Sequence, residues 1–126
     1  MAEVFLKTGG VYHIALAMYH LLFWRLFNWQ DEFSKLSAFN EAVIRALNLS
    51  LTFALVIFGY LSLAHTHELL ATPLGRALLM LIALFWLARA MQQLLFFQHR
   101  DWDSRLFFGL FLLGTALYAF PALWAR

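Results

Sequence analysis

Four long apolar stretches, separated by short polar segments, constrain the fold of this chain more than any other feature. A helix needs about 20 mostly apolar residues to cross the hydrocarbon core of a bilayer. The stretches fall at about residues 9–29, 40–64, 73–98 and 105–120. Because the segments between them are short, consecutive helices must pack as antiparallel neighbours. The sequence therefore predicts an all-α membrane protein, a single-domain up-down-up-down bundle of four transmembrane helices.

The composition of the chain argues against a water-soluble fold. Its 126 residues are 63% hydrophobic and 13% charged, whereas a soluble domain carries about 25% charged residues. A soluble core of this length cannot bury so much apolar surface, so membrane lipids are the expected surroundings. The Lys and Arg residues are scattered without a basic run, so no nucleic-acid partner is indicated. Cysteine is absent, which excludes disulfides and thiolate metal sites.

Residues with known preferences for helix ends predict where several of the spans begin or end. Thr72 offers an N-cap hydroxyl and Pro73 suits the first helical position, which together give a strong start signal for the third span. Asn40 is the expected N-cap of the second span, and the fourth is expected to end before Pro121. The intervening segment 30–39 fits either a short interfacial helix or a polar loop.

The distribution of positive charge predicts an orientation. Cytoplasmic loops carry an excess of Lys and Arg. The side with the first and third loops holds Arg25, Lys35, Arg45, Arg100 and Arg105, and the other holds Lys7, Arg76 and Arg126. We therefore expect a multi-pass protein of a bacterial-type inner membrane with both chain ends on the non-cytoplasmic side.

Polar residues inside the spans mark a candidate site, because they are costly in lipid. One face of the second span carries Glu41, Arg45, Asn48, Thr52 and Gly59, with Ser62 beside it. At 1.5 Å per residue, polar groups on other spans reach a similar depth. The predicted ligand-binding residues are His20, Trp24, Arg45, Asn48, Trp86, Arg89 and Gln92.

Arg89 carries the functional hypothesis. It lies too deep in its span for comfortable snorkelling, and Glu41 is the only acid within the predicted spans. Arg45 competes for that acid, so the layer holds more positive than negative charge. A buried excess of charge is costly without a counter-ion. We therefore expect a cationic intramembrane pocket that binds an anionic or carbonyl-bearing amphiphile, either a lipid or a quinone-like molecule.

Other interpretations remain open. Arg45 can pair with Glu41, while Asn48 and Gln92 can hydrogen-bond across helices as internal contacts. An acid from a membrane protein partner or a second copy could match Arg89, as in an accessory or assembly subunit of a larger complex.

Histidines suggest a further alternative, a haem- or metal-binding protein. His13 and His20 share one face of the first span, and a loop holds His65, His67 and Glu68. The metal signal is weak, and no specific cofactor or metal site is predicted. His20 could also donate a proton in a reaction. The chain contains no nucleophile motif, no HExxH and no phosphate-binding glycine loop, so no particular enzyme activity is predicted.

Overall fold

The computed structural model describes residues 1–97 and 102–124, and every regular element in these ranges is a helix. The elements are α1 (Ala2–Leu21), α2 (Phe23–Leu26), α3 (Trp29–Phe33), α4 (Ala38–Ala64), α5 (Thr66–Ala71), α6 (Pro73–Phe96) and α7 (Trp102–Trp124). The all-α fold predicted from the sequence is confirmed.

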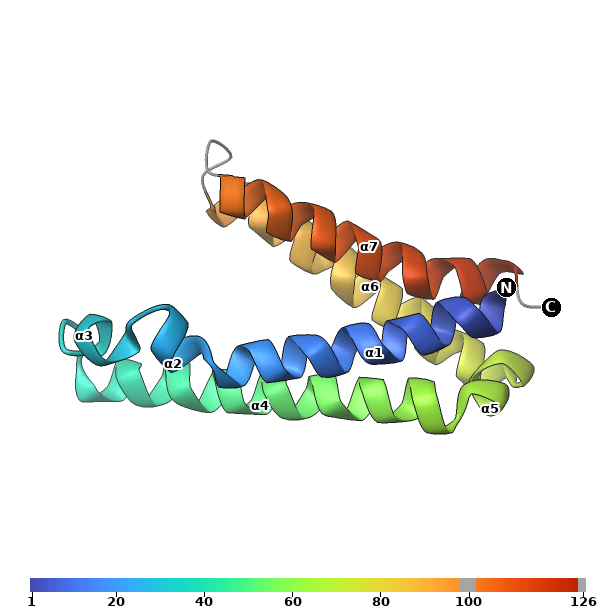
Figure 1. Ribbon diagram of the computed structural model, residues 1–126, viewed down its shortest axis with the longest axis horizontal. Coiled ribbons are helices and arrows are strands. Elements are labelled where there is room, and N and C mark those ends of the chain that lie inside the picture. The colour runs from blue at the N-terminus through green and yellow to red at the C-terminus, as the bar shows by residue number, and fades with distance from the viewer. Residues whose placement is uncertain (98–101, 125–126) are drawn as a thin grey trace.

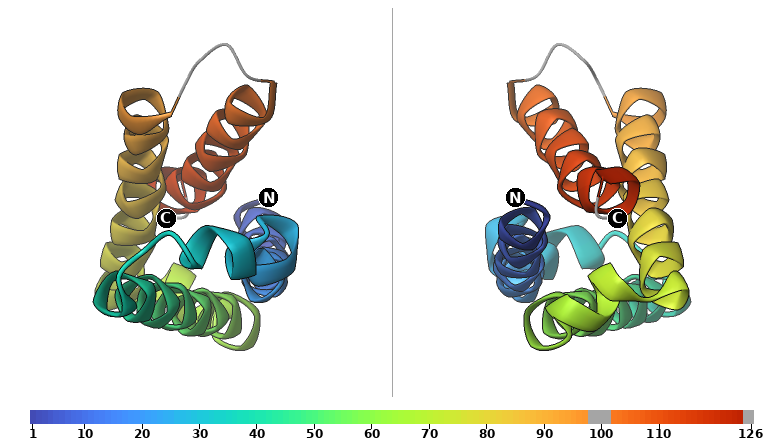
Figure 2. Two further views of the ribbon diagram at one scale, coloured as in Figure 1. Left: turned by 90° about the vertical axis from the view of Figure 1, so that its left-hand side faces the viewer. Right: turned by 90° about the vertical axis from the view of Figure 1, so that its right-hand side faces the viewer.

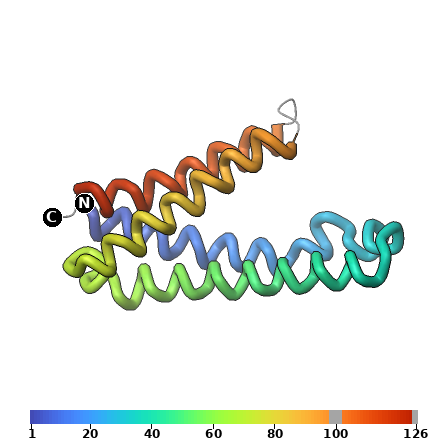
Figure 3. The backbone as a smooth tube through the Cα atoms, turned by 180° about the vertical axis from the view of Figure 1, so that it is seen from behind, coloured from blue at the N-terminus to red at the C-terminus, as the bar shows by residue number. Residues whose placement is uncertain are grey.

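The four long helices alternate in direction and form two pairs, α1 beside α4 and α6 beside α7 (Figure 1). The pairs contact each other mainly through α1 and α7, with α5 packed against α6 and α1. They lie close together at the end that carries α5 and the start of α1, and they diverge toward the opposite end (Figures 1 and 3). The end-on views in Figure 2 show the same separation. The four long helices are therefore antiparallel neighbours, and they form a V of two helical hairpins.

Small residues explain why the V closes at one end. A Cβ atom on Gly9 of α1 would lie 2.6 Å from the Tyr118 ring of α7, and one on Gly114 of α7 would lie 2.6 Å from the Tyr12 hydroxyl of α1. Glycine therefore allows close helix approach at both positions. Toward the open end, Gly109 has no neighbour within 4 Å of such an atom. The two hairpins can approach closely at Gly9 and Gly114, because these residues leave room for the facing aromatic side chains.

Three described helices are long and apolar enough to cross a membrane, namely α4, α6 and α7. This result indicates a multi-pass membrane protein. Helix α1 does not meet the same test of length and composition, because its sequence includes two charged residues and two histidines.

Several helix ends differ from those predicted. The first helix starts at Ala2 and ends at Leu21, so the apolar stretch 9–29 is not one continuous helix. After α2, Asn28 adopts a left-handed conformation with φ of 53°, which reverses the chain into α3. The region expected to be an interfacial helix or loop is therefore in part the short helix α3.

The second and fourth long helices are both longer than expected. Helix α4 begins at Ala38 because Ser37, not Asn40, is its N-cap, and the Ser37 side chain accepts a hydrogen bond from the Asn40 amide at 3.1 Å. Helix α7 continues through Pro121 to Trp124. Proline removes one backbone hydrogen bond and crowds the carbonyl four residues earlier, but Pro121 lies in the last turn of α7, so it disturbs only the end of the helix.

The start signal of the third predicted span is confirmed. Thr72 Oγ1 accepts a hydrogen bond from the Gly75 amide at 2.9 Å, and Pro73 is the first residue of α6. The connection before it, expected to be a polar loop, is the short helix α5. The predicted third loop falls largely on residues 98–101, which lie outside the described residues.

Candidate functional site

A cleft of about 900 Å³ lies between the two hairpins. Its walls come from the second halves of α1 and α6, the first halves of α4 and α7, and the α2–α3 region. These are the segments that diverge toward the open end of the V (Figure 1). A volume of this size is in the range of pockets for small organic ligands, roughly 300–1,000 Å³.

The two sides of the cleft differ in chemistry. On α4 the lining is aliphatic apart from one amide: Ile44, Leu47, Asn48, Leu51 and Leu55. The facing walls are mostly aromatic, with Phe85 and Trp86 on α6 and Phe107 and Phe111 on α7. Trp86 stacks on Phe111 with ring centroids 5.6 Å apart. The cleft therefore offers an aliphatic strip opposite a wall of rings.

Arg89 is the cationic residue in the cleft wall. Its guanidinium carbon lies 4.5 Å from the centre of the Phe111 ring and 5.7 Å from that of Phe97. Within residues 1–97 and 102–124, Arg89 forms neither an ion pair nor a hydrogen bond. Asp103 also lines the cleft without an ion pair to Arg89. A cation over an aromatic face gains roughly 0.5–2 kcal/mol. This contact uses none of the five N–H donors of Arg89, which have no acceptor among the described residues.

His20 and Asn48 join the two helices of the first hairpin beside Arg89. The Asn48 side-chain amide donates to the backbone carbonyl of His20 at 3.0 Å. His20 Nδ1 lies 2.8 Å from the carbonyl oxygen of Leu16. Both residues line the cleft, as do Arg89 and Trp86. Four of the seven predicted site residues therefore meet at one cavity.

The other three predicted site residues lie outside the lining of this cavity. Arg45 is exposed, and its guanidinium pairs with Glu41 at 3.1 Å and lies over the Phe33 ring at 4.9 Å. Gln92 is exposed on the outer face of α6, while its neighbour Gln93 is the buried one. Trp24 is 51% exposed and contacts the side chain of Arg25.

Residues on α6 and α7 that were not predicted add polar atoms to the cleft. The Gln93 amide donates to Ser104 Oγ at 3.2 Å, which ties α6 to α7. Asp103 and Ser104 lie in the first turn of α7. In the sequence they resemble an ordinary capping sequence, so only the position of α7 in space reveals that they face the cavity.

A second polar cluster lies in the closed half of the V, between the cleft and the closed end. His13, Ser62 and Tyr118 are completely buried, and Trp86 is nearly so. Trp86 Nε1 lies 2.9 Å from His13 Nε2. Because an indole N–H can only donate, His13 Nε2 must accept and the ring proton must sit on Nδ1. That nitrogen lies 2.9 Å from the Gly9 carbonyl and 2.8 Å from the Tyr118 hydroxyl.

The direction of each remaining bond in this cluster follows from the same logic. Ser62 Oγ donates to the Phe58 carbonyl at 2.7 Å, so it accepts from the Tyr118 hydroxyl at 2.6 Å. Tyr118 in turn accepts from His13. We call His13, Ser62, Trp86 and Tyr118 the histidine network. It joins α1, α4, α6 and α7, and it engages both ring nitrogens of His13.

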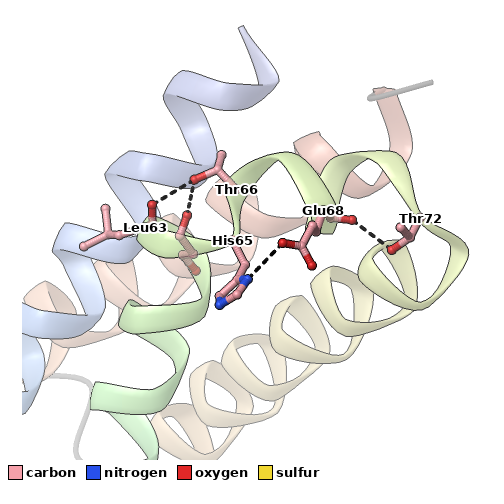
Figure 4. Close-up of polar contacts among 6 residues, drawn as sticks. Leu63, His65, Thr66, Glu68 and Thr72 are labelled. Atoms are coloured by element: carbon pink, nitrogen blue, oxygen red, sulfur yellow. Dashed lines mark hydrogen bonds and ion pairs between the residues drawn. The ribbon is translucent and has the colours of Figure 1, made fainter.

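At the turn between α4 and α5, the contacts of His65 with described residues are to side chains close in sequence, Tyr60 and Glu68. His65 Nδ1 lies 3.1 Å from Glu68 Oε1, and Thr66 and Thr72 donate to backbone carbonyls at 2.6 and 2.8 Å (Figure 4). No three His, Asp or Glu side chains of the described chain gather closely enough to hold a metal ion.

Comparison with known proteins gives no further guidance, because no protein family, curated protein or solved structure matches this chain.

Proposed function

We propose that this protein binds an anionic or carbonyl-bearing amphiphile, a lipid or a quinone-like molecule, in the cleft between its two hairpins. Arg89 holds the polar head of the ligand, His20 and Asn48 orient it, and Trp86 forms part of the apolar wall. The observation that carries this proposal is the Arg89 guanidinium, which lines a ligand-sized cavity and forms no ion pair with any described residue.

Charge balance supports a ligand at Arg89. An uncompensated cation within an apolar layer is costly, and charged residues inside spans usually pair or mark a binding path. A phosphate, carboxylate or carbonyl oxygen would accept the unused N–H donors, and a planar acceptor can take two of them at once. Arg45 differs in this respect, since Glu41 already matches its charge.

The shape of the cleft suits an amphiphile. The aliphatic strip of α4 can cover a hydrocarbon tail, and the aromatic walls can cover flat apolar surface. Polar residues gather at one level of an otherwise apolar cavity, so one end of the ligand must be polar and the rest apolar.

We further propose that α1 crosses the membrane as a fourth span. The two histidines of α1 are turned inward, since His13 is completely buried and His20 lines the cleft, while Glu3 and Lys7 are exposed near the start of the helix. Its outward positions Val11, Ala15, Met18 and Leu21 are exposed and apolar. Since α1 packs between α4 and α7, it would face lipid with a compatible surface. Following the charge count, we place both chain ends on the non-cytoplasmic side.

Chemical analysis of co-purified molecules tests the proposal. Wild-type protein and the variants Arg89→Gln and Arg45→Gln are extracted gently from the same membrane, purified and treated with organic solvent. Mass spectrometry of each extract is expected to reveal an amphiphile that is enriched with wild type and Arg45→Gln and lost with Arg89→Gln. Equal amounts in all three extracts would contradict the role of Arg89. Stoichiometric foreign protein chains without a small molecule would favour the accessory-subunit alternative.

A further inference from the structure

Among the described residues, the cleft contains both hydrogen-bond donors and hydrogen-bond acceptors that lack a protein partner. Arg89 offers only donors. His20 Nδ1 donates to the Leu16 carbonyl at 2.8 Å, since a carbonyl can only accept. Its Nε2 has no partner within residues 1–97 and 102–124 and holds a lone pair when the ring is neutral. A second positive charge beside Arg89 in an apolar cavity would be costly, so the neutral ring is favoured.

Asn48 adds a second unused acceptor. Its amide nitrogen donates to the His20 carbonyl at 3.0 Å, which fixes the orientation of the side chain. The Asn48 oxygen then has no donor among the described residues. A ligand head that only accepts hydrogen bonds, such as a fully ionised phosphate, would satisfy Arg89 and leave both acceptors unpaired. A head with an O–H donor beside an oxygen acceptor would pair with Arg89 and with one of the two acceptors.

Aromatic side chains surround the polar residues Arg89, His20 and Asn48 of the cleft. Arg89 lies over Phe111, and the His20 ring lies 4.3 Å from Phe23. Tyr19 stacks on Phe107 with ring centroids 5.9 Å apart. Aromatic pairs in offset or edge-to-face contact gain roughly 0.5–1.5 kcal/mol beyond their buried area. The aliphatic residues of the cleft lie mainly on α4, across from these rings.

We propose that the ligand head is a planar phenolic ring that carries a second oxygen acceptor, with an apolar tail along α4. The acceptor oxygen binds Arg89, the ring hydroxyl donates to His20 Nε2 or to the Asn48 oxygen, and the ring packs among the aromatic side chains. This inference rests on the proposed function, and it selects a ring-bearing ligand over an acyl lipid with a phosphate head.

The probes that test this inference differ in one group at a time. Heptyl 4-hydroxybenzoate carries a ring hydroxyl, an ester carbonyl and an aliphatic tail. Heptyl benzoate lacks only the hydroxyl, and dodecyl phosphate has an anionic head without a ring. Binding to protein in lipid nanodiscs is followed by tryptophan fluorescence, because Trp86 lines the cleft. Empty nanodiscs correct for partitioning of each probe into lipid.

Wild-type protein is expected to bind the hydroxybenzoate about five- to tenfold more tightly than heptyl benzoate, the effect of one net hydrogen bond. His20→Phe keeps an aromatic ring but removes the acceptor, so this preference is expected to shrink, while His20→Gln keeps an acceptor and should retain more of it. The comparison of probes on wild type needs no variant, so it decides the question even if a variant fails to fold.

The outcomes separate the inference from the proposed function. Equal, Arg89-dependent binding of both benzoates would overturn the role of the hydroxyl and leave the proposed function intact. Arg89-dependent binding of dodecyl phosphate alone would overturn the ring and also leave that function intact. If no probe binds in a way that Arg89→Gln abolishes, and no co-purified molecule depends on Arg89, both proposals fail.

Discussion

Trp86 Nε1 donates a hydrogen bond to His13 Nε2 across 2.9 Å, between residues 73 positions apart in the chain. The same indole ring stacks on Phe111 and lines the cleft. Trp86 therefore links the buried histidine network to the wall of the candidate site. Since both ring nitrogens of His13 have protein partners, we assign His13 a structural role. We propose that the ligand binds nearer the open end of the V, at Arg89.

Trp86→Phe is expected to destabilise the fold. The substitution keeps an aromatic ring but leaves His13 Nε2 buried without a donor, which costs about 1–3 kcal/mol. The matched control is Trp24→Phe, because Trp24 is 51% exposed and lies outside the network. Thermal unfolding of both variants in the same detergent measures the difference. An equal midpoint for Trp86→Phe and wild type would show that the network contributes little to stability.

Gly114→Ala tests the close packing between α7 and its neighbours. A Cβ atom there would lie 2.6 Å from the Tyr12 hydroxyl and 2.9 Å from Trp86 Cγ. Overpacking of this kind costs about 1–3 kcal/mol. Gly109→Ala is the control on the same helix, since nothing lies within 4 Å of its added atom. It should be neutral or stabilising by up to about 1 kcal/mol, from helix propensity alone. Similar unfolding midpoints for both variants would contradict this packing.

The absence of cysteine allows a direct test of the four-span topology. Single substitutions at the exposed residues Glu3, Lys35 and His67 introduce one thiol each. A membrane-impermeant maleimide applied to intact cells is expected to label Glu3→Cys and His67→Cys, and to label Lys35→Cys only after the membrane is opened. Labelling of Glu3→Cys and Lys35→Cys from the same side would show that α1 does not cross. Exact reversal of the pattern would keep four spans and invert the orientation.

Features set by neighbouring residues were predictable from the sequence. Thr72 and Pro73 start α6 through contacts within one turn. The inward face of α4 follows from helical periodicity, and Thr52, Gly59 and Ser62 on that face are buried as expected. The start of α4 was misplaced because Ser37 and Asn40 are both good N-caps. Only the hydrogen bond from the Asn40 amide to Ser37 Oγ distinguishes them.

Features set by distant residues were not predictable in the same way. His13 meets Trp86 and Tyr118 across 73 and 105 positions, and a sequence fixes the depth of a side chain in a span but not its partners. The V shape depends on which side chains face Gly9 and Gly114 across the two hairpins, and no spacing motif in the sequence indicates those partners. The separation of the two hairpins also explains why Arg45, placed on the same α4 face as Asn48, is exposed and lies outside the cleft.

The most direct test of the account is a native mass spectrum of the protein released gently from its own membrane, recorded for wild type, Arg89→Gln and Arg45→Gln. We predict one added small molecule per chain in wild type and in Arg45→Gln, and its loss in Arg89→Gln while that variant keeps the wild-type unfolding midpoint. The same added mass on a folded Arg89→Gln protein, or wild-type chains that carry no added mass, would contradict a ligand held by Arg89.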